Sequence, residues 1–205
     1  MTDKPYNPLD YENLTRNLVR ELMSRGPFKL PLDKPFGGPG VYALFYRGNL
    51  PLYAPVCSPN ATVPIYVGKA VPPGARKGGE ATTENTPSLY RRLREHSESI
   101  GTAKNLRIED FRCRYMVVVP LWITMSERFL IEYYKPVWNV CIEGFGIHDP
   151  GSGRHAGEIS WWDALHPGRP WAESLKRTRM AADAEKRLTS FFASTLSEKS
   201  KKDIL

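Results

Sequence analysis

The sequence predicts an α/β protein of the α+β kind, in which a small central antiparallel sheet is flanked by helices. Short segments rich in β-branched and aromatic residues alternate with longer segments of helical period, and Pro and Gly separate them. The chain has 205 residues and 41% hydrophobic content, which is enough for one sizeable core. An N-terminal helix and a C-terminal helical extension are expected to complete the fold.

The first predicted element is an amphipathic helix over residues 8–25. Leu14, Leu18 and Leu22 recur at helical spacing, with Leu9 and Met23 continuing the series, and Gly26-Pro27 ends the pattern. We expect this helix to pack on the core.

Three strands are predicted. Residues 41–46 lie in "GVYALFY" and residues 64–68 in "PIYVGKA", and a Pro-rich loop too long for a tight hairpin joins them. The segment "DFRCRYMVVVP", residues 110–120, alternates and then becomes continuously apolar, as a central strand does, with Pro120 expected to close it.

Two helices are predicted next to the strands. Residues 87–100 begin with Thr86 as the expected N-cap and Pro87 at the first helical position, and Gly101 is expected to end them. Residues 121–134 have helical period and break at Pro136. The "VWNVC" segment that follows is predicted to be extended.

The last third changes in composition. Residues 144–169 have no period and are rich in Gly, His, Arg and Trp, after which helices are expected over 170–178 and 182–196. The tryptophans of this region are predicted to be packing anchors rather than ligand contacts; they are Trp161, Trp162 and Trp171.

Charge and cysteine content narrow the class of protein. The formal net charge is +7, which favours a polyanionic partner. Cys57, Cys113 and Cys141 lie too far apart for a disulfide framework or a zinc-thiolate spacing. No apolar leader and no run of membrane-spanning length is present, so we expect a cytoplasmic protein without a membrane partner.

Side chains suited to phosphodiester hydrolysis are expected to meet at the edge of the sheet. Arg92 and His96 are four residues apart and therefore share one helix face. The reaction needs a base or a positioned water, cationic groups for the phosphoryl oxygens, and a hard cation held by few carboxylates. The candidates are Tyr42, Tyr66, Arg92, His96, Glu127 and Asn139.

Each candidate alone also has an ordinary structural explanation. Tyr42 or Tyr66 taken singly is more typical of a core aromatic, and Glu127 of a solvated carboxylate in the first turns of a helix. Lys69 fits a strand-end charge and a site lysine equally well. Only the joint pattern favours a site.

The order of these motifs resembles the GIY-YIG nucleases. The two name-giving tripeptides stand here as Gly40-Val41-Tyr42 and Tyr66-Val67-Gly68, followed by "RRLREH", Glu127 and "KPVWN", and the resemblance covers about residues 38–143. The later segments "GFGIHDPGSGR" and "HPGRPWAE" look like those of the small type II restriction endonucleases that cut CCGCGG.

The resemblance implies a role for each candidate. Glu127 would bind one Mg²⁺, for which Mn²⁺ would substitute. Arg92 would contact the scissile phosphate and Asn139 would orient the site. Tyr42, Tyr66 and His96 would share the proton transfers. A phenol can act as the base only where the metal, Lys69 or Arg92 stabilises the phenolate, or where His96 takes the proton. Which tyrosine lies next to the attacking water stays open.

The resemblance also suggests three parts and their DNA contacts. They are residues 1–36 as N-terminal helix and linker, 37–143 as the catalytic core with inserted loops, and 144–205 as a recognition and packing extension of one compact domain. A basic Gly-rich loop suits a DNA backbone and arginine forks suit guanine. The residues expected to bind DNA are Arg76, Lys77, Arg154, His155 and Arg169, with His166 in the same segment.

We therefore expect a type II restriction endonuclease of a bacterial cytoplasm that cuts double-stranded DNA at a palindromic G and C site. Two-fold symmetry of the site implies a homodimer, with a tetramer as an alternative. A repair or structure-selective nuclease with the same core is a second hypothesis, and a non-catalytic DNA-binding module is a third.

Overall fold

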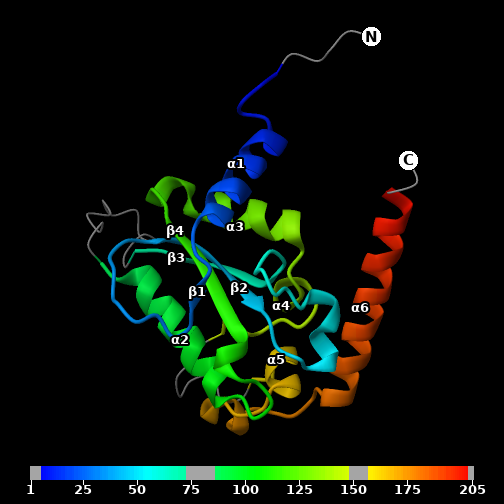
Figure 1. The fold of residues 1–205 in the computed structure, drawn as a ribbon. Coiled ribbons are helices and arrows are strands. Elements are labelled where there is room, and N and C mark those ends of the chain that lie inside the picture. Colours follow the sequence, from blue (N-terminus) through cyan, green and yellow to red (C-terminus); the bar gives the residue numbers. More distant parts are fainter. Residues whose placement is uncertain (1–5, 73–85, 148–156, 203–205) are drawn as a thin grey trace.

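In the described part of the chain, helices surround a small sheet (Figure 1). The computed structural model describes residues 6–72, 86–147 and 157–202, with side chains as far as Thr195. The helices are α1 (Tyr11–Ser24), α2 (Ser88–Thr102), α3 (Pro120–Tyr134), α4 (Val137–Val140), α5 (Trp161–Leu165) and α6 (Ala181–Lys202). The strands are β1 (Phe28–Lys29), β2 (Gly40–Tyr46), β3 (Pro64–Ala70) and β4 (Phe111–Val117). Short 3₁₀ helices are η1 (Pro51–Val56), η3 (Ile108–Asp110) and η5 (Pro170–Ser174).

The four strands form one sheet in the order β1-β4-β2-β3, and every neighbouring pair is antiparallel. The predicted α+β class with a small antiparallel sheet is therefore confirmed. All seven residues of β2 are buried, as expected of a strand between two neighbours. β3 is an edge strand, which leaves one row of its backbone groups without a strand partner.

Each face of the sheet carries its own apolar cluster, because side chains of a strand alternate between faces. Tyr42 and Leu44 of β2 belong to one cluster, which also takes in buried side chains of α2, α4, α5 and α6. Val41 and Ala43 belong to the other, which buries side chains of α1 and α3. Figure 1 accordingly shows α1 and α3 together above the sheet, with α2 and α5 below.

Several predicted boundaries shift in the structure. Pro120 does not close β4, which ends at Val117. It occupies the first turn of α3 instead, where its missing N–H costs nothing. α3 ends at Tyr134, and its capping residue Lys135 has a left-handed φ of 46°. The expected capping of α2 is also wrong, because Pro87 is the capping residue and Gly101 lies inside the helix.

The extended "VWNVC" segment was predicted wrongly. Residues Val137–Val140 form α4, in which the N–H groups of Asn139 and Val140 donate to the Pro136 carbonyl. The left-handed turn at Lys135 and the fixed φ of Pro136 start a new helical turn here. As shown below, this turn aims Asn139 at β3.

The C-terminal helices also differ from prediction. Of the predicted helix 170–178, only Pro170–Ser174 is helical. In place of the predicted helix 182–196, α6 starts at Ala181 and continues beyond residue 196. The helix does not continue past Ser174, because the backbone of Lys176 bonds instead to Gly157 and Ile159 in an isolated bridge. Trp162 of α5 is fully buried, as predicted. Within the described residues, we find no helix with both the length and the hydrophobicity needed to traverse a membrane.

Candidate active site

The two motif tyrosines lie side by side on neighbouring strands. Tyr42 of β2 faces Gly68 of β3 in register, so Tyr66 is its diagonal neighbour, and their ring centroids are 6.2 Å apart. A Cβ at Gly68 would lie 2.4 Å from the Tyr42 hydroxyl and 2.9 Å from Cε1 of Tyr66. The glycine therefore makes room for both rings.

Helix α2 places a histidine against the first of these phenols. Leu89, Leu93 and His96 form part of its buried face, and His96 has no exposed surface. Its Nε2 lies 2.5 Å from the Tyr42 hydroxyl oxygen. The imidazole also stacks on Phe145, with ring centroids 4.5 Å apart and planes 19° apart.

Both phenols are protonated at neutral pH, and burial makes their ionisation still less favourable. It raises the pKa of Tyr42 well above its usual value, and the neighbouring Tyr66 adds to the rise. Burial likewise raises the pKa of Tyr66, which Arg92 opposes. Glu127 raises the pKa of both phenols, so its carboxylate lies within electrostatic reach of them. These residues come from four different elements, β2, β3, α2 and α3, and they lie close enough to form one site.

Arg92 lies one turn before His96 on α2. Its Nη2 donates to the carbonyl of Gly146 at 2.8 Å, and its Nη1 is 3.2 Å from Glu95. The side chain remains 21% exposed, so the guanidinium can meet a phosphate from solvent.

Glu127 approaches from α3, and Lys69 from the edge strand β3. Lys69 Nζ lies 2.8 Å from Glu127 Oε2, and both side chains are partly exposed. Among the residues that the structure describes, no three His, Cys, Asp or Glu side chains gather as a metal cage. A single accessible carboxylate fits Mg²⁺, which keeps several waters and takes substrate phosphate oxygens as ligands.

Asn139 binds the open edge of the sheet. Its Oδ1 accepts from the N–H of Val67, and its Nδ2 donates to the carbonyl of the same residue, both at 2.8 Å. The amide thereby replaces a neighbouring strand and fixes β3 between Tyr66 and Gly68. The orienting role expected of Asn139 stays a prediction, and its observed contact is with the backbone of β3 beside Tyr66.

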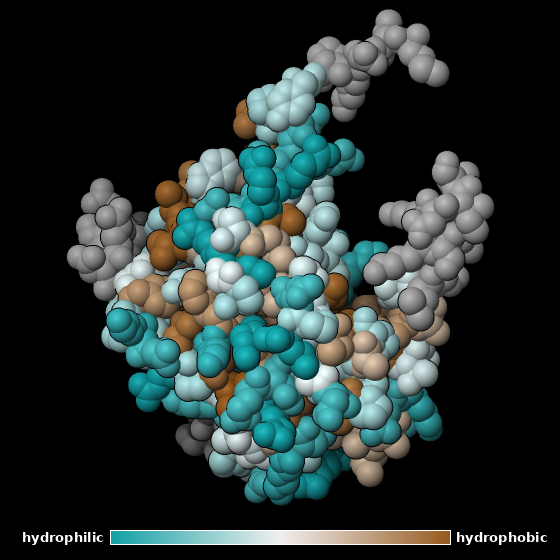
Figure 2. All heavy atoms as spheres, in the orientation of Figure 1, coloured by the Kyte–Doolittle hydropathy of each residue, from teal (hydrophilic) through white to brown (hydrophobic). Residues whose placement is uncertain are grey.

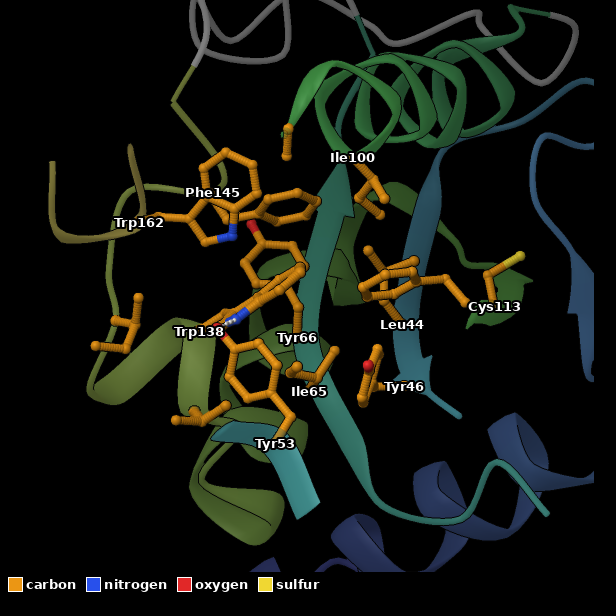
Figure 3. Close-up of a cluster of buried hydrophobic side chains, with 14 of the residues drawn as sticks. Leu44, Tyr46, Tyr53, Ile65, Tyr66, Ile100, Cys113, Trp138, Phe145 and Trp162 are labelled. Atoms are coloured by element: carbon orange, nitrogen blue, oxygen red, sulfur yellow. Dashed lines mark hydrogen bonds between the residues drawn. The ribbon is translucent and has the colours of Figure 1, made fainter. Parts of the chain in front are cut away.

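A second buried tyrosine and histidine pair lies outside the site around Tyr42 and His96. Tyr53 OH is 2.5 Å from Nε2 of His166 and accepts from Trp138 Nε1 at 2.8 Å, a bond drawn in Figure 3. His166 Nδ1 lies 2.9 Å from Asn105 Oδ1. Burial lowers the pKa of His166 to about 3, and the Arg169 charge adds to this. His166 is therefore a neutral core group and not a surface contact for DNA.

Arg169 does not have the position expected of a DNA contact. The residue is 3% exposed, and its guanidinium pairs with the equally buried Asp163 at 2.6 Å. It has no free surface with which to contact a base. Four other expected DNA-binding residues lie outside the described residues, namely Arg76, Lys77, Arg154 and His155.

Sequence reasoning missed Phe145 and Gly146, which contact His96, Tyr66 and Arg92. Figure 3 shows Phe145 and Tyr66 lying together on one side of β3. The signal was present: "GFG" flanks an aromatic residue with two glycines, as a backbone in close approach to other groups requires. A Cβ at Gly146 would lie 2.5 Å from the Tyr66 hydroxyl.

Together the fold and the site define a small α+β domain in which two tyrosines, a histidine, an arginine and a glutamate lie near one another. A family model described as the Eco29kI GIY-YIG domain matches residues 34–191. The chain belongs to this GIY-YIG family, and it is a nuclease by that membership. No curated protein shows a significant match to it.

Proposed function

We propose that the protein is a type II restriction endonuclease that hydrolyses double-stranded DNA with Mg²⁺ at the palindrome CCGCGG. One observation carries the proposal: His96, Arg92 and the partly exposed carboxylate of Glu127 all lie within hydrogen-bond or electrostatic reach of Tyr42. The match to the Eco29kI domain supports the choice of site, since the segment beyond the core is included in the match.

The proposed reaction is attack of water on phosphorus with loss of the opposite oxygen. Glu127 would hold the cation. When bound, the cation would neutralise charge on the phosphoryl oxygens. Arg92 would donate to the non-bridging phosphoryl oxygens as their negative charge grows. Lys69, freed from Glu127, would add a second positive charge at the same edge.

Burial assigns different positions to the two tyrosines. Tyr42 has no exposed surface, whereas Tyr66 keeps 8% of its surface exposed. We infer that Tyr66 is the phenol that orients the attacking water. The Tyr66 oxygen would take a proton from this water while its own hydroxyl proton passes to the Tyr42 oxygen, and Tyr42 would pass its proton to Nε2 of His96. The water thus attacks as hydroxide and the imidazole ends protonated. The P–O bond then breaks, and the departing oxygen takes a proton from solvent.

The same proposal covers assembly and location. A palindromic site presents two equivalent strands, so a homodimer with one active site per strand fits it. A tetramer would be a dimer of such dimers. Sedimentation equilibrium of the protein bound to a palindromic duplex tests the dimer. A single subunit per duplex, with both strands still cut, would contradict it. A cytoplasmic location in a bacterium follows from a restriction role.

A plasmid digest tests the function. A supercoiled plasmid with one CCGCGG site and a matched plasmid without it are incubated with protein and Mg²⁺, and the ends are mapped. The proposal expects one linear product from the first plasmid and none from the second. Cleavage only at flaps or lesions would favour a structure-selective nuclease, and inert protein that binds DNA would favour a binding module.

A further inference from the structure

The backbone of residues 144–147 lies directly against the proposed catalytic groups. Phe145 stacks on His96 and contacts Tyr66 at a ring distance of 4.9 Å. The next carbonyl, of Gly146, accepts from Arg92 Nη2. A small displacement of this segment would therefore move the imidazole and the guanidinium together.

Arg169 holds this segment from behind. Its Nη1 donates to the carbonyls of Phe145 at 3.1 Å and Ile147 at 2.9 Å, and its Nη2 donates to the carbonyl of Gly144 at 3.0 Å. Three carbonyls within four residues thus converge on one side chain. Gly144 has a φ of 113°, the left-handed region that favours glycine and turns its carbonyl into this arrangement.

Asp163 completes the guanidinium's bonding. Arg169 Nε donates to Oδ1 at 2.6 Å and Nη2 to Oδ2 at 2.7 Å. With the three carbonyls, all five N–H donors of Arg169 have acceptors. Ser160 Oγ also donates to Asp163 Oδ2, at 2.6 Å, which fixes the carboxylate.

The environment of the pair favours a fixed guanidinium. The guanidinium carbon lies 4.5 Å from the ring centre of Trp162 and 4.7 Å from that of Trp171. A planar guanidinium that contacts two aromatic rings and has every donor bonded is held in one geometry. Removing one partner would leave a buried, unpaired charge, which is costly.

We propose that Arg169 is a positioning residue for DNA cleavage. With Asp163 it fixes residues 144–147, and through their Gly146 carbonyl and Phe145 ring it sets the orientation of Arg92 and His96. This inference rests on the proposed nuclease function and assigns to Arg169 a task other than DNA contact. Arg92 and His96 act on the substrate, while Arg169 acts through them.

Two different variants test the role of Arg169, so that the test does not depend on the folding of a single variant. Arg169→Lys keeps the positive charge beside Asp163 but cannot bond three carbonyls in a plane. The double variant Arg169→Met with Asp163→Leu removes both charges, so no unpaired charge is buried. The matched control is Arg114→Met: Arg114 is 6% exposed and donates to the carbonyls of Met23, Arg25 and Ala61 on the other side of the sheet.

The cleavage rate, the Kd for DNA and the side-chain NMR signals are measured on the folded fraction of each variant at low temperature. Both Arg169 variants are expected to lower single-turnover kcat at least tenfold, with the Kd for the CCGCGG duplex within threefold of wild type. The side-chain NMR signals of Arg92 and His96 are expected to shift. Arg114→Met should lower the unfolding temperature while leaving kcat per folded molecule and both signals unchanged.

A mutant cycle separates positioning from general weakening. In an Arg92→Lys background, the Arg169→Lys change should cost less than it does in the wild type, because the part of its effect that passes through Arg92 is already lost. Unchanged kcat, unshifted signals or fully additive losses would overturn the inference. If the wild type does not cleave DNA, the proposed function fails, and the NMR signals alone decide whether Arg169 positions Arg92 and His96.

Discussion

Tyr42 and His96 form a hydrogen bond in the protein interior, with the phenol oxygen 2.5 Å from Nε2 and neither side chain exposed. The bond joins strand β2 to helix α2 beside the exposed edge of the site. A buried polar pair of this kind is expected either to stabilise the fold or to take part in proton transfer. The two roles give different mutant behaviour.

Tyr42→Phe removes the hydroxyl and keeps the ring. We expect kcat to fall by about 10²–10⁴, the usual contribution of a proton-transfer partner, while DNA binding is retained. Single-turnover cleavage and fluorescence anisotropy measure the two quantities.

Tyr53→Phe is the matched control, because Tyr53 forms an equally short hydrogen bond to His166 outside the proposed active site. Its loss should reduce stability by about 1–3 kcal/mol, since Trp138 and His166 lose a buried partner. Cleavage per folded molecule should not change. Equal losses of kcat in both variants would show that the Tyr42 hydroxyl has no special part in the reaction.

Gly68→Ala should displace the Tyr42 hydroxyl, because the new Cβ would lie 2.4 Å from it. We expect at least tenfold lower kcat, measured on the folded fraction. Gly101→Ala is the control: no atom lies within 4 Å of its Cβ, and it sits inside α2. That change should stabilise the protein by up to about 1 kcal/mol, because alanine favours a helix over glycine. Wild-type cleavage by Gly68→Ala would contradict the packing of the phenol against β3.

The stability of the protein should fall in mild acid because of His166. Its folded-state pKa is lowered to about 3, while the unfolded chain binds a proton near the ordinary value of about 6.5. Between these values the unfolded state holds more protons, so each unit fall in pH removes up to about 1.4 kcal/mol of unfolding free energy. Chemical denaturation at pH 7 and pH 4.5 measures the loss.

His166→Gln should flatten this dependence, because glutamine does not titrate. A variant with the same pH dependence as wild type would show that other groups cause the loss.

Much of the fold was predictable because its signals are local. The apolar runs of β2, β3 and β4 and the periods of α2 and α3 depend on neighbouring residues, and they are found within a few positions of prediction. Terminal positions were less accurate, as with Pro120, which suits the end of a strand and the start of a helix alike.

The site was predictable only in part, because its candidates were found by motif while their contacts depend on tertiary structure. An arginine in a segment rich in Gly and His is most often exposed, so Arg169 was assigned to DNA. Its burial depends on Asp163 and on three carbonyls of residues 144–147, which no local pattern announces. The same holds for Asn139, whose contact with Val67 requires the helical turn of α4.

The most direct test of the account is the cleavage rate of Glu127→Gln on a duplex with one CCGCGG site, alongside its Kd for that duplex without divalent cation. Loss of the single site carboxylate should slow cleavage by at least about 10³, since metal-assisted charge stabilisation contributes several kcal/mol, and leave Kd within threefold. Glu98→Gln, an exposed carboxylate paired with Arg94, should cleave like wild type. Cleavage by Glu127→Gln at the wild-type rate would contradict a cation site at this carboxylate and the mechanism built on it.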